Sequence, residues 1–155
     1  MGHNNSLYLD CYPVLKYMQW TSGDYEKDPT LLYWENCQIR TWLNGEFYES
    51  AFTAEEKKWI SAALLENDWN YTSEDRSRGM GGADTTDRVF LLSEREGLTS
   101  RAHLATDYAK ANGAPSDVYG QNDVWRRDTS YKTYAGFWNG FRGVSPCIQI
   151  KIPAA

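Results

Sequence analysis

The chain has 155 residues, which predicts a single domain, and its formal net charge is −5. This acidic balance argues against sequence-independent nucleic-acid binding, which needs a basic face to displace counterions. No apolar stretch approaches the roughly 20 residues that span a bilayer and no signal peptide is recognisable, so we expect no membrane insertion and assign no location. Display on a virion or a cell surface would depend on other components. Three cysteines and two histidines at long spacings fit neither a disulfide framework nor a zinc site, so we predict no metal and no cofactor.

The first half of the chain carries the main helical signals. Residues 6–14 alternate roughly in polarity and predict a strand, and the polar residues 21–30 predict a loop. Apolar residues at helical spacing predict a helix over residues 36–44, which an Asn-Gly pair would end. A capping-box sequence, Thr-Ala-Glu-Glu, then opens a second predicted helix that reaches about residue 66.

The second half reads as loops and strands around short helical turns. Residues 67–87 are polar and glycine-rich and predict a long loop, which a buried strand follows over residues 88–92. A second capping-box pattern at residues 93–96 and a threonine cap before residues 107–111 predict two short helical segments. Residues 147–152 alternate as a final strand. Because no repeat or linker interrupts the chain, we predict one α+β domain over residues 1–155.

The close carboxylate pairs are explained better by structure than by catalysis. Glu55 and Glu56 lie in the first turn of a predicted helix, where the helix dipole favours acidic side chains. Asp84 and Asp87 precede a buried strand, where Asp and Thr side chains commonly anchor turns. Neither histidine lies in a nucleophile motif, and no phosphate-binding glycine loop is present. The sequence therefore predicts that the chain is not an enzyme.

The C-terminal tail differs from the rest of the chain in composition. Seven aromatic residues between positions 119 and 141 are interleaved with Asn, Asp, Gln, Arg and Lys. Tyrosine combined with small polar residues is typical of antibody-like recognition surfaces, because its ring gives a wide contact area at a low entropic cost. The alternative is that these aromatic residues fill the core, and we expect this of Trp125 and of Trp138.

Several motifs, in order along the chain, resemble a widespread family of microbial and viral domains. Residues 33–48 (YWENCQIRTWLNGEFY) and 51–57 (AFTAEEK) match a stretch written S-x-I-R-x-W-L-N-x-x-F-Y-x-x-A-F-x-x-E-E-K in that family. Later landmarks are DTTDRVFLLS, ATDYAKANGA, Trp-Arg-Arg where members carry Trp-Leu-Arg, and Gly-Val-Ser-Pro where they carry Gly-Val-Arg-Pro. The family is similar to the formylglycine-generating-enzyme branch of the C-type lectin fold, and some members are variable proteins of diversity-generating retroelements.

The resemblance implies a C-type lectin fold, with two helices packed on small antiparallel sheets and much irregular loop. It also implies that residues 115–144 form a variable region, which a retroelement rewrites at adenines and which binds an unknown protein or other surface ligand. Randomising the adenines of an AAC codon gives Asn, Tyr, Asp, Ser, Phe, Arg and several other residues but never Trp, Lys, Gln, Glu or Met, so the tryptophans would be scaffold. The eligible ligand-binding positions are Tyr119, Asn122, Asp123, Arg126, Asp128, Tyr131, Tyr134, Phe137, Asn139 and Phe141.

Two other functions remain open beside the recognition module. A calcium-dependent carbohydrate-binding lectin would need several converging oxygen ligands, and the chain has Asn122-Asp123 but no Glu-Pro-Asn or Gln-Pro-Asp motif. An oxidase like the formylglycine generators would need a paired-cysteine copper site, for which Cys11, Cys37 and Cys147 provide no close pair in the sequence.

The sequence also departs from the family in three places. The segment between residues 127 and 143 is shorter than in many relatives, so we expect a smaller binding face. Ser145 stands where members usually have Arg. The first strands of the family are missing or reduced before residue 6, so we expect a compact variant or a trimmed chain.

Overall fold

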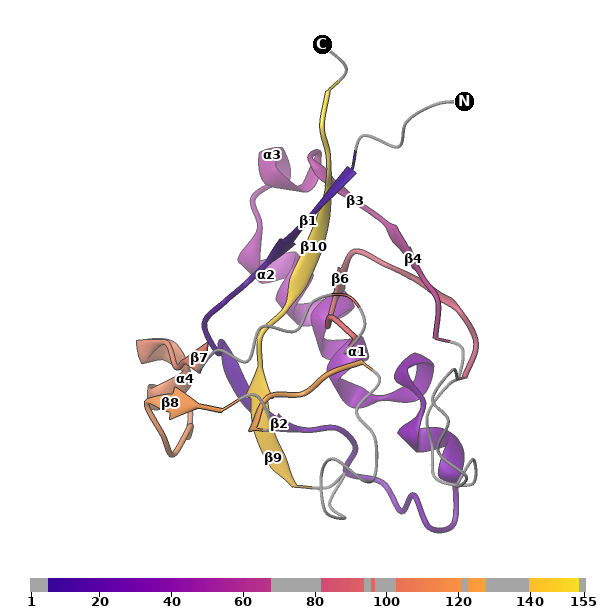
Figure 1. Cartoon of the computed structure of the whole chain (residues 1–155), viewed down its shortest axis with the longest axis vertical. Coiled ribbons are helices and arrows are strands. Elements are labelled where there is room, and N and C mark those ends of the chain that lie inside the picture. Colours follow the sequence, from indigo (N-terminus) through magenta and orange to yellow (C-terminus); the bar gives the residue numbers. More distant parts are fainter. Residues whose placement is uncertain are drawn as a thin grey trace.

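The computed structural model describes residues 6–67, 82–93, 96, 103–120, 123–127 and 140–153. The central strand of its main sheet is β10 (Cys147–Lys151), which pairs with β1 (Ser6–Asp10) along the full length of both strands (Figure 1). On its other side β10 pairs first with β6 (Val89–Phe90) and then with β3 (Ile60–Ser61). All of these pairings are antiparallel. Because β1 and β10 come from the first and last parts of the sequence and β3 and β6 from its middle, the main sheet joins these three parts.

Three two-stranded antiparallel sheets complete the described β structure. They pair β2 (Lys16–Gln19) with β9 (Phe141–Val144), β4 (Ala63–Leu65) with β5 (Thr85–Asp87), and β7 (His103–Leu104) with β8 (Val118–Tyr119). β9 and β10 follow one another along the centre of the molecule, and α4 (Asp107–Ala111) lies with β7 and β8 beside β2 and β9 (Figure 1). This arrangement brings the start of the predicted variable region next to its end.

One main helical segment follows two 3-10 turns, η1 (Pro29–Leu32) and η2 (Trp34–Asn36). It consists of α1 (Gln38–Trp42), the π-helical η3 (Leu43–Phe47) and α2 (Tyr48–Ala51). The predicted end at the Asn-Gly pair is wrong, because Gly45 takes φ −109° and ψ −105° and kinks the helix without ending it.

The side chain of Asn44 holds β6 against this kinked helix. Its Oδ1 accepts the backbone amides of Arg88 and Val89 at 2.9 and 3.1 Å, and its Nδ2 donates to the Val89 carbonyl at 2.8 Å. A single amide side chain thus pairs with backbone groups of a strand far away in the sequence. Asn44 serves as a bridge to the sheet rather than as a helix terminator.

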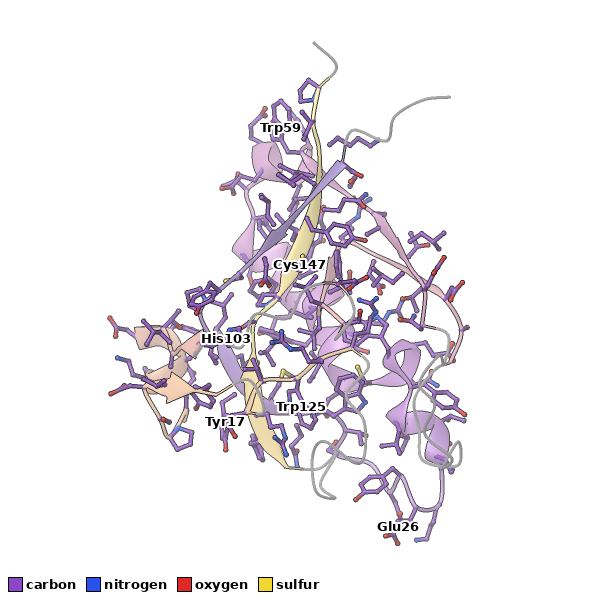
Figure 2. All side chains as sticks on the ribbon, in the orientation of Figure 1. Tyr17, Glu26, Trp59, His103, Trp125 and Cys147 are labelled. Atoms are coloured by element: carbon purple, nitrogen blue, oxygen red, sulfur yellow. The ribbon has the colours of Figure 1, made fainter. Side chains whose placement is uncertain are left out.

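The second predicted helix, over residues 53–66, is wrong beyond its first turn. Its capping box is confirmed, since Thr53 and Glu56 exchange hydrogen bonds of 2.7 and 3.2 Å, but α3 (Ala54–Lys57) ends after four residues. The chain then continues as β3 and β4, with Ile60 paired to β10 and Trp59 about half exposed near α3 (Figure 2). The apolar residues here fit both a helix and two short strands. Pairing of β3 with β10 and of β4 with β5 decides for the strands.

Three predicted strands and one short helix are confirmed with shorter bounds. Thr85–Asp87, at the end of the predicted loop, forms strand β5 instead. The helical segment expected over residues 93–96 lies partly outside the described residues, and Glu96 is in a turn. The strands expected over residues 6–14, 88–92 and 147–152 contain β1, β6 and β10. The short helix after Thr106 is α4, whose cap accepts the Ala109 amide at 3.1 Å and which ends before Gly113 at φ +99°. The class is therefore α+β, as predicted, with one main helix rather than two. No helix in the described ranges is both long enough and apolar enough to cross a membrane.

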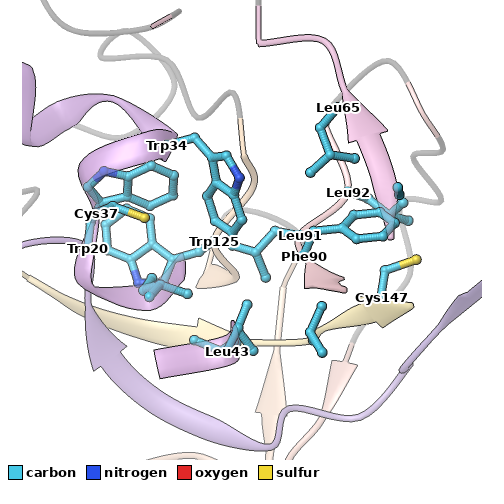
Figure 3. Packing of buried hydrophobic residues seen from close by; sticks show 14 of the residues in the cluster. Trp20, Trp34, Cys37, Leu43, Leu65, Phe90, Leu91, Leu92, Trp125 and Cys147 are labelled. Atoms are coloured by element: carbon cyan, nitrogen blue, oxygen red, sulfur yellow. The ribbon is translucent and has the colours of Figure 1, made fainter. Parts of the chain in front are cut away.

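The core is built around three tryptophans. The ring centroid of Trp20 lies 5.9 Å from that of Trp34 and 5.5 Å from that of Trp125, and each of the three residues is 1% exposed. Leu91 and Phe90 continue the packing from these rings toward the main sheet (Figure 3). The expectation that Trp125 fills the core is confirmed, whereas Trp138 lies outside the described residues.

Candidate functional site

A pocket of about 400 Å³ lies between the α4–β8 segment and the β2–β9 sheet, and we call it the aromatic pocket. It brings together three of the ten predicted ligand-binding residues, Tyr119, Asp123 and Phe141. The other lining residues are Tyr17, Pro115, Ser116, Val118, Gly140 and Arg142. Its volume falls within the range of about 300–1,000 Å³ that small-ligand pockets commonly have.

Strand pairing places aromatic rings side by side along one wall of this pocket. The register of β2 and β9 sets Tyr17 opposite Gly143 and Gln19 opposite Phe141, so Tyr17 and Phe141 are diagonal neighbours on the same face of the sheet. Their ring centroids are 5.5 Å apart, and Tyr119 of β8 adds a third ring 6.1 Å from Tyr17. The wall is therefore a row of three rings from three strands.

The segment that carries Asp123 is anchored by its neighbour Trp125. The Trp125 amide donates to the Gly143 carbonyl at 2.9 Å, and its indole N–H donates to the Met18 carbonyl at 2.8 Å. In Figure 2, Trp125 and Tyr17 lie on either side of β9. Asp123 itself is exposed, and its Oδ2 accepts the Gly120 amide at 3.2 Å. A buried tryptophan thus fixes the backbone beside an exposed carboxylate.

Tyr119 lines the pocket from a buried position. The residue is 4% exposed, and its hydroxyl makes no hydrogen bond with any of the described residues. Burial raises the pKa of Tyr119 above its ordinary value. The side chain therefore stays a neutral phenol and contributes its ring to the wall.

Two of the four described candidate residues are buried, which corrects the expectation of a wholly outward-facing surface. Tyr119 is 4% exposed and Arg126 is 5% exposed, whereas Asp123 and Phe141 are exposed. Arg126 does not line the pocket. Its neighbours Trp125 and Arg127 donate their backbone amides to the Gly143 and Leu92 carbonyls. The remaining six candidates lie outside the described residues: Asn122, Asp128, Tyr131, Tyr134, Phe137 and Asn139.

Tyr17 is the pocket residue that sequence reasoning missed. No strand is predicted at β2, where Lys16, Tyr17, Met18 and Gln19 do not alternate in polarity. Each face of the strand carries one polar and one apolar residue, so the sequence holds no period-two signal there. Only the pairing with β9 shows that the Tyr17 ring meets the variable region.

The described residues offer no second site of comparable interest. Among them, no three His, Cys, Asp or Glu side chains gather as metal ligands. The three cysteines are free, and burial raises the pKa of Cys37 to about 12 and also raises the pKa of Cys147, which keeps both thiols protonated. A second, largely apolar pocket of about 370 Å³ lies beside β1, and none of the predicted site residues lines it.

Replacing Tyr119 by Phe is expected to leave the free energy of unfolding unchanged or to raise it by up to about 1 kcal/mol. The reason is that a buried hydroxyl without a partner costs free energy, and its removal breaks no described hydrogen bond. Urea denaturation measures the change. Thr85→Val is the control, because that hydroxyl donates to Asp87 at 2.8 Å and its loss should cost about 1.5–3 kcal/mol. An equal loss in Tyr119→Phe would show that its hydroxyl is paired after all.

Comparison with known proteins places the chain in a family. No curated protein and no solved structure matches it. Residues 13–150 match the family described as "Domain of unknown function (DUF6273)". This match covers most of the chain and includes every lining residue of the aromatic pocket. The chain therefore belongs to the DUF6273 family.

Proposed function

We propose that this chain is a ligand-recognition module rather than an enzyme, and that the aromatic pocket is part of its binding face for a protein or other surface ligand. One observation carries the proposal: Tyr119, Asp123 and Phe141, three of the predicted variable positions, line a single pocket. Aromatic rings beside an exposed carboxylate supply contact area and adjustable polar contacts, as recognition surfaces do.

The framework beneath the pocket supports this function. A surface whose residues vary needs a scaffold whose stability does not depend on them. Asp123 lies two positions from the buried Trp125, and Phe141 is 52% exposed in a strand whose Val144 is fully buried. Each exposed residue therefore sits on backbone that a buried neighbour holds in place.

We further propose that the domain has the C-type lectin fold of the formylglycine-generating-enzyme branch, and that a diversity-generating retroelement rewrites residues 115–144. The α+β class and the small antiparallel sheets support the fold proposal. The burial of Trp125, a residue that adenine mutagenesis of AAC codons cannot produce, supports its assignment to the invariant scaffold.

The DNA around the gene tests the retroelement. We expect a near-copy of the 3′ end of the gene that differs from it only at adenines and lies beside a reverse-transcriptase gene. The positions at which the copy and the gene differ should include the codons of Asp123 and Phe141, and the Trp125 codon should be the same in both. A neighbourhood without such a copy, or a copy that differs at all four bases, would contradict diversification.

A calorimetric titration of the full chain with Ca²⁺ and with Cu⁺ tests the function class. We expect no stoichiometric uptake of either metal by a recognition module. Tight uptake of one Ca²⁺ would instead support the carbohydrate-binding lectin, since calcium sites are built from several converging oxygen ligands. Tight uptake of Cu⁺ would support the oxidase.

A further inference from the structure

We propose that the aromatic pocket receives an alkylammonium group, the chemistry shared by a lysine side chain of a partner protein and by a free quaternary ammonium compound. The inference rests on the proposed function, because it names the chemistry that this binding face recognises. Three features carry it: the row of rings, the exposed carboxylate of Asp123, and the position of the one cationic residue among the described lining residues.

The row of rings provides the first feature. The face of an aromatic ring carries negative charge density and attracts a cation within about 6 Å of its centroid. The Tyr17 and Phe141 ring centroids are 5.5 Å apart, which is close enough for an ammonium group seated against both rings to contact each of them. Tyr119, which is 4% exposed, packs beside Tyr17 and extends the wall inward. Phe141 is 52% exposed, which leaves part of this wall open to a ligand.

The carboxylate of Asp123 provides the second feature. Its Oδ2 accepts the Gly120 amide, whereas its Oδ1 makes no hydrogen bond with the described residues. An aromatic wall next to an exposed carboxylate gives a cation both a polarisable face and a counter-charge. The net charge of −5 attracts cations to the whole chain over longer distances.

Arg142 is the pocket residue whose positive charge would repel a cation, so the position of its guanidinium is important. Successive residues of a strand point to opposite faces, so Arg142 projects away from the face that carries Phe141. Its guanidinium lies 5.3 Å from the centroid of the Trp125 ring. Arg142 therefore reaches the pocket from the face of β9 opposite to Phe141, with its guanidinium beside the Trp125 ring.

Other ligand chemistries fit these residues less well. An anion would meet the Asp123 carboxylate and the net negative charge of the chain. A purely apolar group would cover the carboxylate without pairing it, and an unpaired charge that is removed from water is costly. An alkylammonium group satisfies the rings and the carboxylate together.

The test is an NMR titration of the ¹⁵N-labelled full chain with choline and with 3,3-dimethyl-1-butanol, its neutral isostere. We expect choline to shift the amide signals of residues 118–120 and 141–143 with a millimolar Kd, and the isostere to bind at least tenfold more weakly. Nα-acetyl-lysine methylamide forms the third arm. Tighter binding of choline identifies a free quaternary ammonium compound as the source, and tighter binding of the lysine derivative identifies a partner's side chain.

Variants localise the binding to the aromatic pocket. Asp123→Asn and Phe141→Leu are each expected to weaken choline binding about threefold or more, in line with one cation contact at an exposed site. Asp117→Asn is the matched control, because Asp117 is an exposed carboxylate that does not line the pocket and pairs with Lys110 at 3.5 Å. Amide spectra of the variants show that each of them is folded.

Two results would overturn the inference, and neither involves a variant that must fold. In one, the neutral isostere binds as tightly as choline. In the other, none of the probes shifts the amide signals of the pocket residues when it is present at about 50-fold excess over about 1 mM protein. A Kd too weak to be detected at that probe concentration would be too weak for cation recognition. Either result leaves the proposed function standing, because the recognition function fails on a different measurement, the stoichiometric uptake of Ca²⁺ or Cu⁺, and its diversification fails on a missing adenine-variant copy of the gene.

Discussion

Replacing Asp87 by Ala is expected to lower the free energy of unfolding by about 3–5 kcal/mol, the cost of breaking a buried ion pair by removing one partner. The Asp87 side chain is 1% exposed. Its Oδ2 accepts the Trp34 indole at 2.9 Å and the Thr85 hydroxyl at 2.8 Å, and its Oδ1 accepts two guanidinium nitrogens of Arg40 at 2.8 Å. The substitution leaves these donors without their acceptor, between the main helix and β5.

Urea denaturation followed by tryptophan fluorescence measures this loss. Asp87→Asn keeps the shape and one acceptor oxygen but removes the charge, so it should fall between wild type and Asp87→Ala. Asp24→Ala is the control for loss of an ion pair at the surface, since Asp24 and Lys27 pair at 2.9 Å with side chains 52% and 86% exposed. A similar loss in the control and in Asp87→Ala would mean that burial does not strengthen the Asp87 network.

Arg127→Ala is the second substitution with a large expected effect, again about 3–5 kcal/mol of the free energy of unfolding. The Arg127 side chain is 3% exposed and makes a two-pronged ion pair with Glu96, with both N–O distances 2.8 Å. It also donates to the Asn67 side chain at 2.9 Å and to the Leu91 carbonyl at 2.8 Å. One guanidinium therefore ties the end of β4 to the segment after β6.

The partner of Arg127 makes this contribution depend on pH. Burial alone would raise the pKa of Glu96, but the Arg127 ion pair and the Ser93 amide outweigh it and hold the pKa below its usual 4.5. Because the folded pKa is depressed, the stabilisation is complete above about pH 4.5 and is lost as the pH falls through the folded pKa. The difference in unfolding free energy between wild type and Glu96→Gln should therefore be largest at pH 6–7 and shrink by pH 3. A difference that stays constant from pH 7 to pH 3 would show that the negative charge of Glu96 does not contribute to the free energy of unfolding.

The surroundings of Asp87 show how far local sequence signals reach. Asp and Thr residues before a buried strand predict side chains with a structural role, and this is confirmed, since Asp84 accepts the Asn67 amide at 3.0 Å and Thr85 donates to Asp87. The predicted turn is wrong, because Thr85–Asp87 forms β5 against β4. The partners of Asp87 could not be predicted in the same way. Trp34 and Arg40 lie about 50 positions earlier in the sequence and reach Asp87 only because the helix packs on β5.

The candidate site shows the same division. Composition and the resemblance direct attention to the C-terminal tail, and three of its positions line the aromatic pocket. The sequence does not reveal that Tyr17 completes the ring wall or that Arg126 is enclosed. The first outcome depends on the pairing of β2 with β9, which joins residues more than 100 positions apart. The second accompanies backbone hydrogen bonds from Trp125 to Gly143 and from Arg127 to Leu92.

Taken by itself, the amino-acid sequence determined the α+β class, the terminal strands, the helix caps at Thr53 and Thr106 and the burial of Trp125, because alternation, capping and bulk act between residues that are neighbours in the chain. Tertiary structure alone decided that residues 60–65 are strands, that the helix continues through Gly45, and that Tyr17, Tyr119, Asp123 and Phe141 share a pocket. The physical reason is that a short apolar segment has nearly equal local preferences, so the unpaired hydrogen-bonding edge of a distant strand determines its structure.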